Sequence, residues 1–315
     1  MTNAIDLSII IVSWNTADYL AACLTSIEAV IRRDEDSLTF DERRRTLEVI
    51  VVDNASADGS QRLVSERFSW ATLIENETNI GFAAANNAGI RQARGRYIML
   101  LNSDTEVHPG AMETLLRFME ERPAAGACGP RLLNTDGTLQ PSCTPMLTPG
   151  RELWRLLFLD QIAPRASYPM ARWDPGTPRP VEVIKGACMV LRRDALDAVG
   201  LLDESYFMYT EEVDLCFRLA AAGWELWWVP QAVVTHHGEA SSRQVAQEMY
   251  LQLYRSKVQF YRKFGGEREA NRFKRYLRIA YWPRLAIATL AAPFRSRLGA
   301  QRSTYRQLLK ALSEM

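Results

Sequence analysis

The chain has 315 residues, and 47% of them are hydrophobic, which is enough to bury a large core in one domain or in one domain with an appendage. Its formal net charge of +1 excludes the overall basic bias of a nucleic-acid-binding protein. The five cysteines are scattered and form no CxxC pair, a pattern typical of reduced core thiols in the cytoplasm. The sequence shows no signal-peptide pattern and no run of the roughly 20 apolar residues that cross a bilayer. We therefore expect a cytoplasmic protein.

Apolar runs alternate with helical patterns in the first hundred residues. Four runs predict strands, in residues 7–13, 47–53, 71–76 and 96–104. A helical pattern spans residues 19–27, and a second helix is expected over residues 81–95, closed by Gly95. Pro109 is expected to open a further helix, and the charged residues 32–46 indicate a surface excursion. Strands that alternate with helices predict a parallel arrangement in an α/β sheet.

The second half is less regular. Residues 136–180 are rich in Pro and Gly and predict no clear element. Beyond them the patterns predict a strand followed by a helix in residues 183–196 and a helix in residues 211–222. They then predict strands in residues 225–237 and a helix in residues 244–264. From about Arg268 the chain becomes basic and aromatic. We expect an α/β domain over residues 1–265 and a basic amphipathic helical tail over residues 266–315.

Polar residues follow three of the predicted strands. They are Ser13-Trp14-Asn15, Asp53-Asn54 and Asn102-Ser103-Asp104. Ligands of open α/β sheets bind beyond the carboxyl ends of the strands. A purely structural sheet does not need polar side chains at each strand end, so the sequence predicts a binding site at that edge.

Two polar clusters in this half each have a functional and a structural interpretation. The Asp53 carboxylate can accept a hydrogen bond from the imide N–H of uracil or thymine, or it can belong to an Asx-type turn before a helix. The second cluster lies at a predicted helix start and comprises Asn79, Gly81, Asn86 and Asn87. It can bind a ligand through its side-chain amides and the backbone at Gly81, or it can simply be a polar patch. Both alternatives stay open at each cluster.

The remaining candidates are carboxylates. Asp104 can bind a hard divalent cation that also takes diphosphate oxygens, or it can lie in a helix N-cap region. Glu211, Glu212 and Asp214 can supply a general base near an acceptor hydroxyl. Alternatively, these acids complement a helix dipole behind Thr210 as the N-cap.

His236 and His237 end the last predicted strand. Neutral imidazole is a good ligand for Mn²⁺-type ions. Neighbouring residues of a strand point to opposite faces, so at most one of the two faces the site. Taken singly, each is better explained as a surface or core histidine.

Taken together, several segments resemble the family 2 glycosyltransferases with the GT-A fold, and among them bacterial rhamnosyltransferases of cell-surface polysaccharide synthesis. The resemblance runs from about residue 7 to residue 260. The segments that carry it are IIIVSWNTADYLAACLTSI, VIVVDNASADGS, NIGFAAANNAGIRQARGRYIMLLNSDTEVHPG, KGACMVLRRDAL, FMYTEEVDLCFRLAAAGW and VVTHHGEASS. It implies a mixed, Rossmann-like sheet flanked by helices, with a C-terminal helical extension.

The resemblance also implies a donor site. Positions implied to contact the nucleotide or its sugar are Trp14, Asn15, Asp53, Asn54, Asn79, Gly81, Phe82, Asn87, Asn102 and Ser103. Asp104 matches the last acid of the family's DxD metal motif, which reads Asn-Ser-Asp here. His236 would complete a Mg²⁺ or Mn²⁺ site, with His237 as the second candidate.

On the acceptor side, Glu212 takes the position of the family's catalytic base, where Asp is usual, and Glu211 stands beside it. Asp214 and Trp224 are expected near the acceptor. The implied reaction is an inverting transfer of L-rhamnose from dTDP-L-rhamnose, or secondly of a sugar from a UDP-sugar, to a hydroxyl of a lipid-linked or surface glycan. A non-catalytic nucleotide-sugar-binding scaffold is the alternative.

The basic tail has two interpretations. Helices rich in Arg with Trp and Tyr often lie on anionic membranes, which would place the protein at the inner face of the plasma membrane. The alternative is a helical cap or a homodimer contact.

Overall fold

The chain divides into two units, which we call the sheet unit and the helical unit. The computed structural model describes residues 5–34, 37–238, 242–291 and 296–315. The sheet unit comprises Met1–Thr144, Pro169–Phe207 and Glu211–Gln244. The helical unit comprises Pro145–Tyr168, Met208–Thr210 and Val245–Met315. The Pro- and Gly-rich residues 136–180 therefore contribute to both units.

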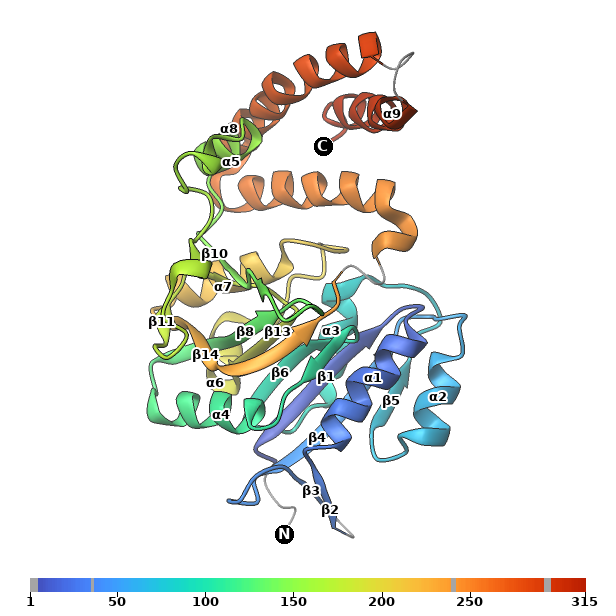
Figure 1. Cartoon of the computed structure of the whole chain (residues 1–315), viewed down its shortest axis with the longest axis vertical. Coiled ribbons are helices and arrows are strands. Elements are labelled where there is room, and N and C mark those ends of the chain that lie inside the picture. Colours follow the sequence, from blue (N-terminus) through green and yellow to red (C-terminus); the bar gives the residue numbers. More distant parts are fainter. Residues whose placement is uncertain (1–4, 35–36, 239–241, 292–295) are drawn as a thin grey trace. The chain divides into compact units, whose positions relative to one another are not determined.

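A mixed sheet forms the centre of the sheet unit (Figure 1). In chain order its strands are β1 (Leu7–Ser13), β2 (Arg32–Asp34), β3 (Ser37–Thr39), β4 (Thr46–Asp53), β5 (Thr72–Glu75), β6 (Tyr97–Asn102), β7 (Thr105–Val107), β8 (Ala125–Leu133), β9 (Leu139–Gln140), β11 (Arg179–Pro180), β13 (Cys188–Arg192) and β14 (Glu225–His236). Across the sheet the order is β11-β14-β8-β13-β6-β1-β4-β3-β2, and β5, β7 and β9 pair with β4, β14 and β8. A separate antiparallel pair joins β10 (Cys143–Thr144) to β12 (Val183–Ile184). The predicted α/β class with a mixed sheet is confirmed.

Strand β1 lies at the point where the chain changes direction across the sheet. It pairs in parallel with β4 on one side and with β6 on the other. From β1 the chain goes to β4 and β5, and it then returns to place β6 on the opposite side of β1. A crevice at the carboxyl ends of the strands forms at such a switch point, and ligands bind there.

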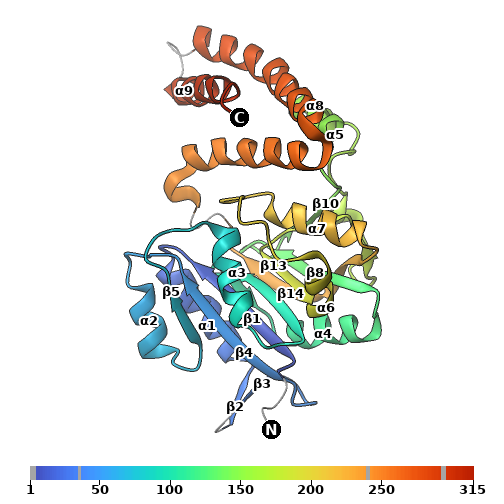
Figure 2. The ribbon, with the colours of Figure 1, turned by 180° about the vertical axis from the view of Figure 1, so that it is seen from behind.

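Helices cover both faces of the sheet (Figures 1 and 2). The helices of this unit are α1 (Ala17–Glu28), α2 (Ser60–Arg67), α3 (Phe82–Gln92), α4 (Ala111–Glu121), α6 (Arg193–Val199) and α7 (Glu211–Ala221). Figure 1 shows α1 and α4 over one face, and Figure 2 shows α3 and α6 over the other. A strand with a helix layer on each side buries both its faces, which explains why every residue of β1 is buried.

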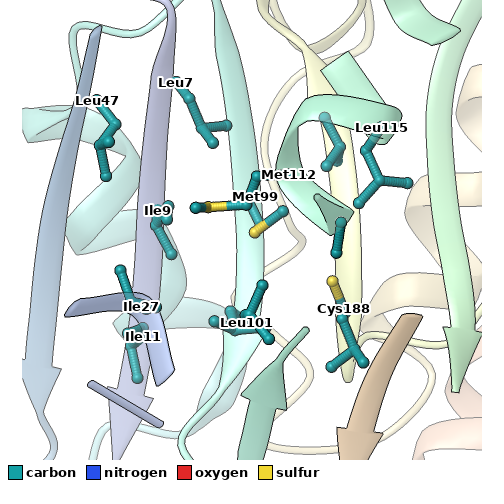
Figure 3. Close-up of a cluster of buried hydrophobic side chains, with 14 of the residues drawn as sticks. Leu7, Ile9, Ile11, Ile27, Leu47, Met99, Leu101, Met112, Leu115 and Cys188 are labelled. Atoms are coloured by element: carbon teal, nitrogen blue, oxygen red, sulfur yellow. The ribbon is translucent and has the colours of Figure 1, made fainter. Parts of the chain in front are cut away.

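Alternate residues of the buried strands pack against different helix layers. Leu7, Ile9 and Ile11 belong to a core cluster with residues of α1 and α4, such as Ile27 and Met112 (Figure 3). On the opposite face, a Cβ at Gly89 of α3 would lie 2.5 Å from the Ile10 side chain. All five cysteines are buried and free, as predicted for core thiols.

Strand β8 was not predicted. Its sequence, AGACGPRLL, has two glycines and a proline where a strand pattern usually has branched residues. A Cβ at Gly129 would lie 2.4 Å from the Ile184 side chain, so β12 approaches this strand too closely for any larger residue. Tertiary packing therefore determines a strand that local preference does not indicate.

Two predicted helix boundaries were wrong. Helix α3 ends at Gln92, and Gly95 is not its cap. The Gly95 N–H instead donates to Ser8 Oγ at 2.7 Å, in a contact with β1 that leaves no room for a Cβ. Helix α4 begins at Ala111 behind Gly110, whose φ is 77°, so Pro109 precedes the helix and does not open it.

The helical unit contains α5 (Pro149–Leu156), α8 (Ala246–Ala291) and α9 (Ser296–Ala311). Thr148 caps α5 by accepting from the Arg151 N–H at 3.2 Å, and Pro149 follows as its first residue. Gly266, with φ 70° and ψ −178°, interrupts α8. The change to a basic composition near residue 266 therefore coincides with a kink inside α8, while the unit itself resumes at Val245.

A buried ionic cluster joins α5 to α8. Lys257 Nζ and Arg155 Nη2 lie 2.7 Å and 2.6 Å from Glu152 Oε2. Burial alone would raise the pKa of Glu152, but the two cations lower it below its ordinary value. This carboxylate is thus held in its charged form inside the unit. Within the described residues, no helix is both long and apolar enough to span a membrane.

Candidate functional site

The carboxyl ends of β1, β4 and β6 meet at one edge of the sheet. Ser13 of β1 is in register with Asp53 of β4, and Val12 of β1 is in register with Asn102 of β6. The polar residues that follow these three strands therefore lie along one edge, as the sequence predicts.

Asn15 and Ser103 hold the loops at this edge together. The Asn15 N–H donates to Ser56 Oγ at 2.9 Å, and Asn15 Oδ1 accepts from the Ala57 N–H at 2.7 Å. Ser103 Oγ lies 2.9 Å from Thr16 Oγ1. Both side chains, which were predicted to contact the donor, thus have structural partners between the loops. Trp14, beside Asn15, is half-buried.

Asp53 is bound through one of its two carboxylate oxygens. Oδ2 accepts from the Ser56 N–H at 2.9 Å and from Gln61 Nε2 at 2.6 Å. Oδ1 is buried and has no hydrogen-bond partner among the described residues. A buried oxygen without a partner is unfavourable, and a ligand N–H would satisfy it. The turn interpretation and the base-binding interpretation of Asp53 therefore apply to different oxygens.

Asn54 and Asn79 form a network that shapes the start of α3. Asn54 Nδ2 donates to Asn79 Oδ1 at 2.7 Å, and the Gly81 N–H donates to the same oxygen at 3.0 Å. Gly81 has φ 87°, and a Cβ there would lie 2.5 Å from the Phe207 carbonyl oxygen. The close Phe207 backbone therefore requires glycine at position 81. The Phe207 carbonyl oxygen also accepts from the Phe82 N–H at 2.7 Å.

Asn87 does not face the donor side, so its predicted nucleotide contact is not supported. Its Nδ2 donates to the Leu202 carbonyl at 2.8 Å and to Glu204 Oε1 at 2.9 Å. Its Oδ1 accepts from the Leu202 N–H at 3.1 Å. The amide is 1% exposed and fixes the segment before α7, which explains an asparagine inside a helix.

Asp104 and His236 face each other beyond β6 and β14. Asp104 Oδ1 lies 3.3 Å from His236 Nε2, and Asn102 Nδ2 lies 3.4 Å from the same nitrogen. On the other side of the ring, His236 Nδ1 lies 2.6 Å from Gln140 Oε1. Because an amide oxygen accepts, Nδ1 carries a proton, and in the neutral ring the lone pair lies on Nε2, next to Asp104 Oδ1 and Asn102 Nδ2.

This arrangement fits a divalent cation. A lone pair and a carboxylate oxygen 3.3 Å apart repel each other unless a proton or a metal ion interacts with both. Two ligands at right angles on an octahedral ion, each about 2.1 Å from it, lie about 3.0 Å apart. The side-chain amide oxygen of Asn102, Oδ1, is buried beside them and has no hydrogen-bond partner in the described part of the chain. No group of three or more His, Cys, Asp or Glu side chains that could hold a metal occurs in the described part of the chain, so any ion would need further ligands besides Asp104 and His236.

His237 points away from Asp104. Its Nε2 lies 2.7 Å from Glu106 Oε1, and its ring packs edge-on against Tyr19 with centroids 5.2 Å apart. Alternation along β14 therefore directs His236, and not His237, toward the strand ends, as the resemblance implies.

The acidic pair lies at the start of α7. A Cβ at Gly186 would lie 3.7 Å from Glu212 Cβ and 3.7 Å from Phe82 Cε1, so these two side chains flank Gly186. Burial, and then the neighbouring Glu212, raises the pKa of Glu211 well above its ordinary value, and Glu211 Oε2 has no hydrogen-bond partner among the described residues. Burial lowers the pKa of Lys185, whose charge interacts favourably with Glu212.

Asp214 has a structural role, which corrects its predicted place near the acceptor. It is fully buried, and its Oδ1 accepts from Arg218 Nε at 2.6 Å. Tyr206 OH donates to Oδ2 of the same carboxylate at 3.3 Å. Arg218 in turn donates to the carbonyls of residues 199–201, so the pair fixes the chain before α7.

Trp224 was also expected on the acceptor side and lies at the other end of the sheet. It precedes Glu225, which is in register with Ala125 at the start of β8. Near the other end of the same strand, Thr235 is in register with Leu133, eight residues further along β8 and about 26 Å away. The Trp224 side chain packs against Gly126 instead.

Two residues of the site were not predicted from the sequence. Gln140 lies in a stretch with no clear pattern and reaches His236 because β9 pairs with β8. Lys185 is a half-buried lysine between two buried strands. A lysine inside such an apolar stretch is unusual and could have drawn attention to this position. Neither signal is specific without the tertiary structure.

Comparison with known proteins gives a consistent result. Residues 8–200 match the family described as glycosyl transferase family 2. An N-acetylglucosaminyl-diphospho-decaprenol L-rhamnosyltransferase of Mycobacterium tuberculosis is 34% identical over 208 residues, which cover 61% of this chain and 67% of that protein.

Solved structures share the fold at lower identity. The mannosyltransferase PcManGT from Pyrobaculum calidifontis, in complex with GDP-Man and Mn²⁺, has a TM-score of 0.55 and 18% identity, over 99% of this chain and 85% of that one. GalNAc-T7 with UDP, GalNAc and Mn²⁺ has a TM-score of 0.54 and 15% identity, over 84% and 52% of the two chains.

Proposed function

The chain belongs to glycosyl transferase family 2, and on this premise we propose that it is a metal-dependent, inverting rhamnosyltransferase. Its donor is dTDP-L-rhamnose, and its acceptor is a hydroxyl of a lipid-linked or growing surface glycan. The observation that carries the proposal is the pair formed by Asp104 and His236, which lies at the same sheet edge as Asp53 and presents two facing acceptor atoms.

The donor assignment rests on two supports. The mycobacterial relative is described as transferring L-rhamnose to an N-acetylglucosaminyl-diphospho-decaprenol. The buried Oδ1 of Asp53, which no described residue contacts by a hydrogen bond, suits the imide N–H of thymine and equally that of uracil. A UDP-sugar is therefore the second candidate donor.

Asp104 and His236 would hold Mg²⁺ or Mn²⁺, with Asn102 beside them. When bound, the ion supplies charge neutralisation for the diphosphate leaving group. Gln140 Oε1 accepts from His236 Nδ1, so the Nε2 lone pair of the neutral ring would be available to the ion.

Glu212 acts as the general base. It accepts the proton of the acceptor hydroxyl, whose oxygen forms a bond to the anomeric carbon as the bond to the diphosphate oxygen breaks on the opposite face. One displacement inverts the configuration, and no covalent enzyme intermediate is needed. Lys185, opposite Glu212, favours the charged carboxylate that this step requires.

Incubation with dTDP- and UDP-sugars, Mn²⁺ or Mg²⁺ and a lipid-linked acceptor tests the proposal. We expect release of nucleoside diphosphate, loss of turnover with EDTA, and an inverted anomeric configuration by NMR. Turnover that survives both EDTA and Asp104→Ala would overturn the metal assignment. Nucleotide binding without turnover would indicate a non-catalytic scaffold.

A further inference from the structure

Charge is unevenly distributed between the two units. The residues of the helical unit include 18 Lys and Arg but six Asp and Glu, a formal charge of +12 in a chain whose total is +1. The remainder of the chain therefore carries −11. Residues 270–313 contain ten basic residues and no acidic one. A cationic surface of this density attracts an anionic partner over about 8–10 Å at physiological salt.

The later part of α8, from Leu277 to Leu290, carries apolar side chains on both its inner and its outer side. Its inner side is buried through Leu277, Ala280, Tyr281 and Ala288. Its outer side carries exposed apolar side chains: Ile279 58%, Trp282 59%, Ile287 63% and Leu290 77% exposed. At 100° per residue these four fall within about 140° of the helix circumference, so they form one stripe. An exposed stripe of this kind marks an interaction surface.

Arginines continue the same stripe toward Gly266. Arg268, Arg272 and Arg275 are exposed and fall within about 60° of each other around the helix, in line with Ile279. Arg278 is exposed at its margin. One helix surface thus has a basic half followed by an apolar half. Beside α8, the exposed Phe158 ring packs against the Arg284 guanidinium at 4.9 Å.

We propose that this surface of α8, the stripe from Arg268 to Leu290, rests on a bilayer containing anionic lipids. Ile279 to Leu290 cover about 16 Å of helix, too short to cross a bilayer but sufficient to lie in its interface. Trp282 suits the headgroup level, and the arginines suit anionic phosphates. The reason for such membrane binding rests on the proposed function, since a lipid-linked acceptor is located at a membrane surface.

A second copy of the chain is the less suitable occupant. Two helical units that met through this surface would each bring a formal charge of +12 to the contact. Like charges in close contact are destabilising, whereas an anionic bilayer complements both halves of the stripe.

Vesicle flotation of the full chain tests the proposal. The apolar variant combines Trp282→Gln, Ile287→Gln and Leu290→Gln, and the basic variant combines Arg268→Gln, Arg272→Gln and Arg275→Gln. A matched control, Arg33→Gln, Arg43→Gln and Arg62→Gln, makes the same charge change at exposed arginines of the sheet unit. The probes are vesicles of phosphatidylglycerol with phosphatidylcholine, and of phosphatidylcholine alone.

We expect the wild type and the control to float with the anionic vesicles, and both other variants to bind at least about tenfold more weakly. Binding to pure phosphatidylcholine should be weak for all four. Absence of flotation, or flotation that neither variant changes, would overturn the proposal. So would a dimer, measured by light scattering, that the apolar variant dissociates.

Nucleoside diphosphate release on a short, water-soluble acceptor separates this proposal from the proposed function. All four proteins should keep wild-type turnover there, because none of the substituted residues belongs to the catalytic site. If turnover is absent while flotation follows the expected pattern, only the proposed function fails.

Discussion

Two buried glutamates, one in each unit, have opposite surroundings. Glu152 of the helical unit is 3% exposed and is held by Lys257 and Arg155, so its pKa falls below the ordinary value although burial opposes this. Glu211 of the sheet unit is 4% exposed, has an oxygen with no hydrogen-bond partner among the described residues, and has a pKa raised by burial and by Glu212.

This difference in surroundings distinguishes Glu152, a carboxylate with a structural role, from Glu211, a carboxylate in the candidate functional site. A satisfied buried ion pair fixes the packing of two helices, and removing one partner destabilises the fold. Two adjacent acids with incomplete hydrogen bonding cost stability, and such strained groups persist where function requires them. Substitution of Glu152 should therefore lower stability, whereas loss of the Glu212 carboxylate beside Glu211 should lower activity.

The largest effect is expected at Glu212. Glu212→Gln should lower the turnover number by about 10²- to 10⁴-fold, because the amide cannot accept the acceptor proton. Its melting temperature and nucleotide affinity should match the wild type. Glu211→Gln is the matched control and should keep substantially more activity. Wild-type turnover in Glu212→Gln would refute the assignment of the base.

Lys257→Met tests the other carboxylate. Loss of one partner of the buried pair should lower the free energy of unfolding by about 3 kcal/mol, measured by urea denaturation. Because the folded pKa of Glu152 is lowered, its stabilisation is present above the ordinary value of 4.5 and is lost as the pH falls through the folded value. The variant should therefore lose less stability on acidification than the wild type. Lys263→Met, at an exposed lysine of the same helix, should leave stability nearly unchanged.

Gln140→Leu should weaken Mn²⁺ binding by about 10- to 100-fold, the range found when a partner that orients a metal-bound histidine is removed. Thermal stabilisation by Mn²⁺ with nucleoside diphosphate measures this without turnover. Asn134→Ala removes a second partner of the Gln140 amide, at 2.9 Å, but leaves the contact with His236. It should have the smaller effect. Equal effects of the two variants would contradict a specific role of Gln140 on the imidazole.

The smallest effect concerns Glu211 and pH. Its raised folded pKa means that its contribution to stability is fully present below 4.5 and is lost as the pH rises through the folded value. Glu211→Gln has no such loss, so it should be more stable than the wild type by about 1 kcal/mol at pH 8, with the difference vanishing near pH 4. Glu152→Gln should show the opposite sign at pH 8, and the same sign for both would contradict the comparison.

Much of the sheet edge could be predicted from the sequence. The apolar runs that end at Ser13, Asp53 and Asn102 are local patterns, and parallel strands bring their carboxyl ends together. Trp224 and Asn87 could not be placed in this way. Trp224 adjoins a strand whose far end bears the site, and Asn87 turns its amide toward residues 202–204 because of the packing around α3.

The sequence by itself determined the strands, the family resemblance and the basic character of the C-terminal part, because each depends on composition or on residues close together along the chain. Only the tertiary structure decided which carboxylates are satisfied. Asp214 received Arg218, Glu152 received Lys257, and Glu211 was left with an oxygen unbound within the described residues. Whether a carboxylate finds a partner depends on residues up to 105 positions away in the sequence. Burial then determines how much free energy each missing partner costs.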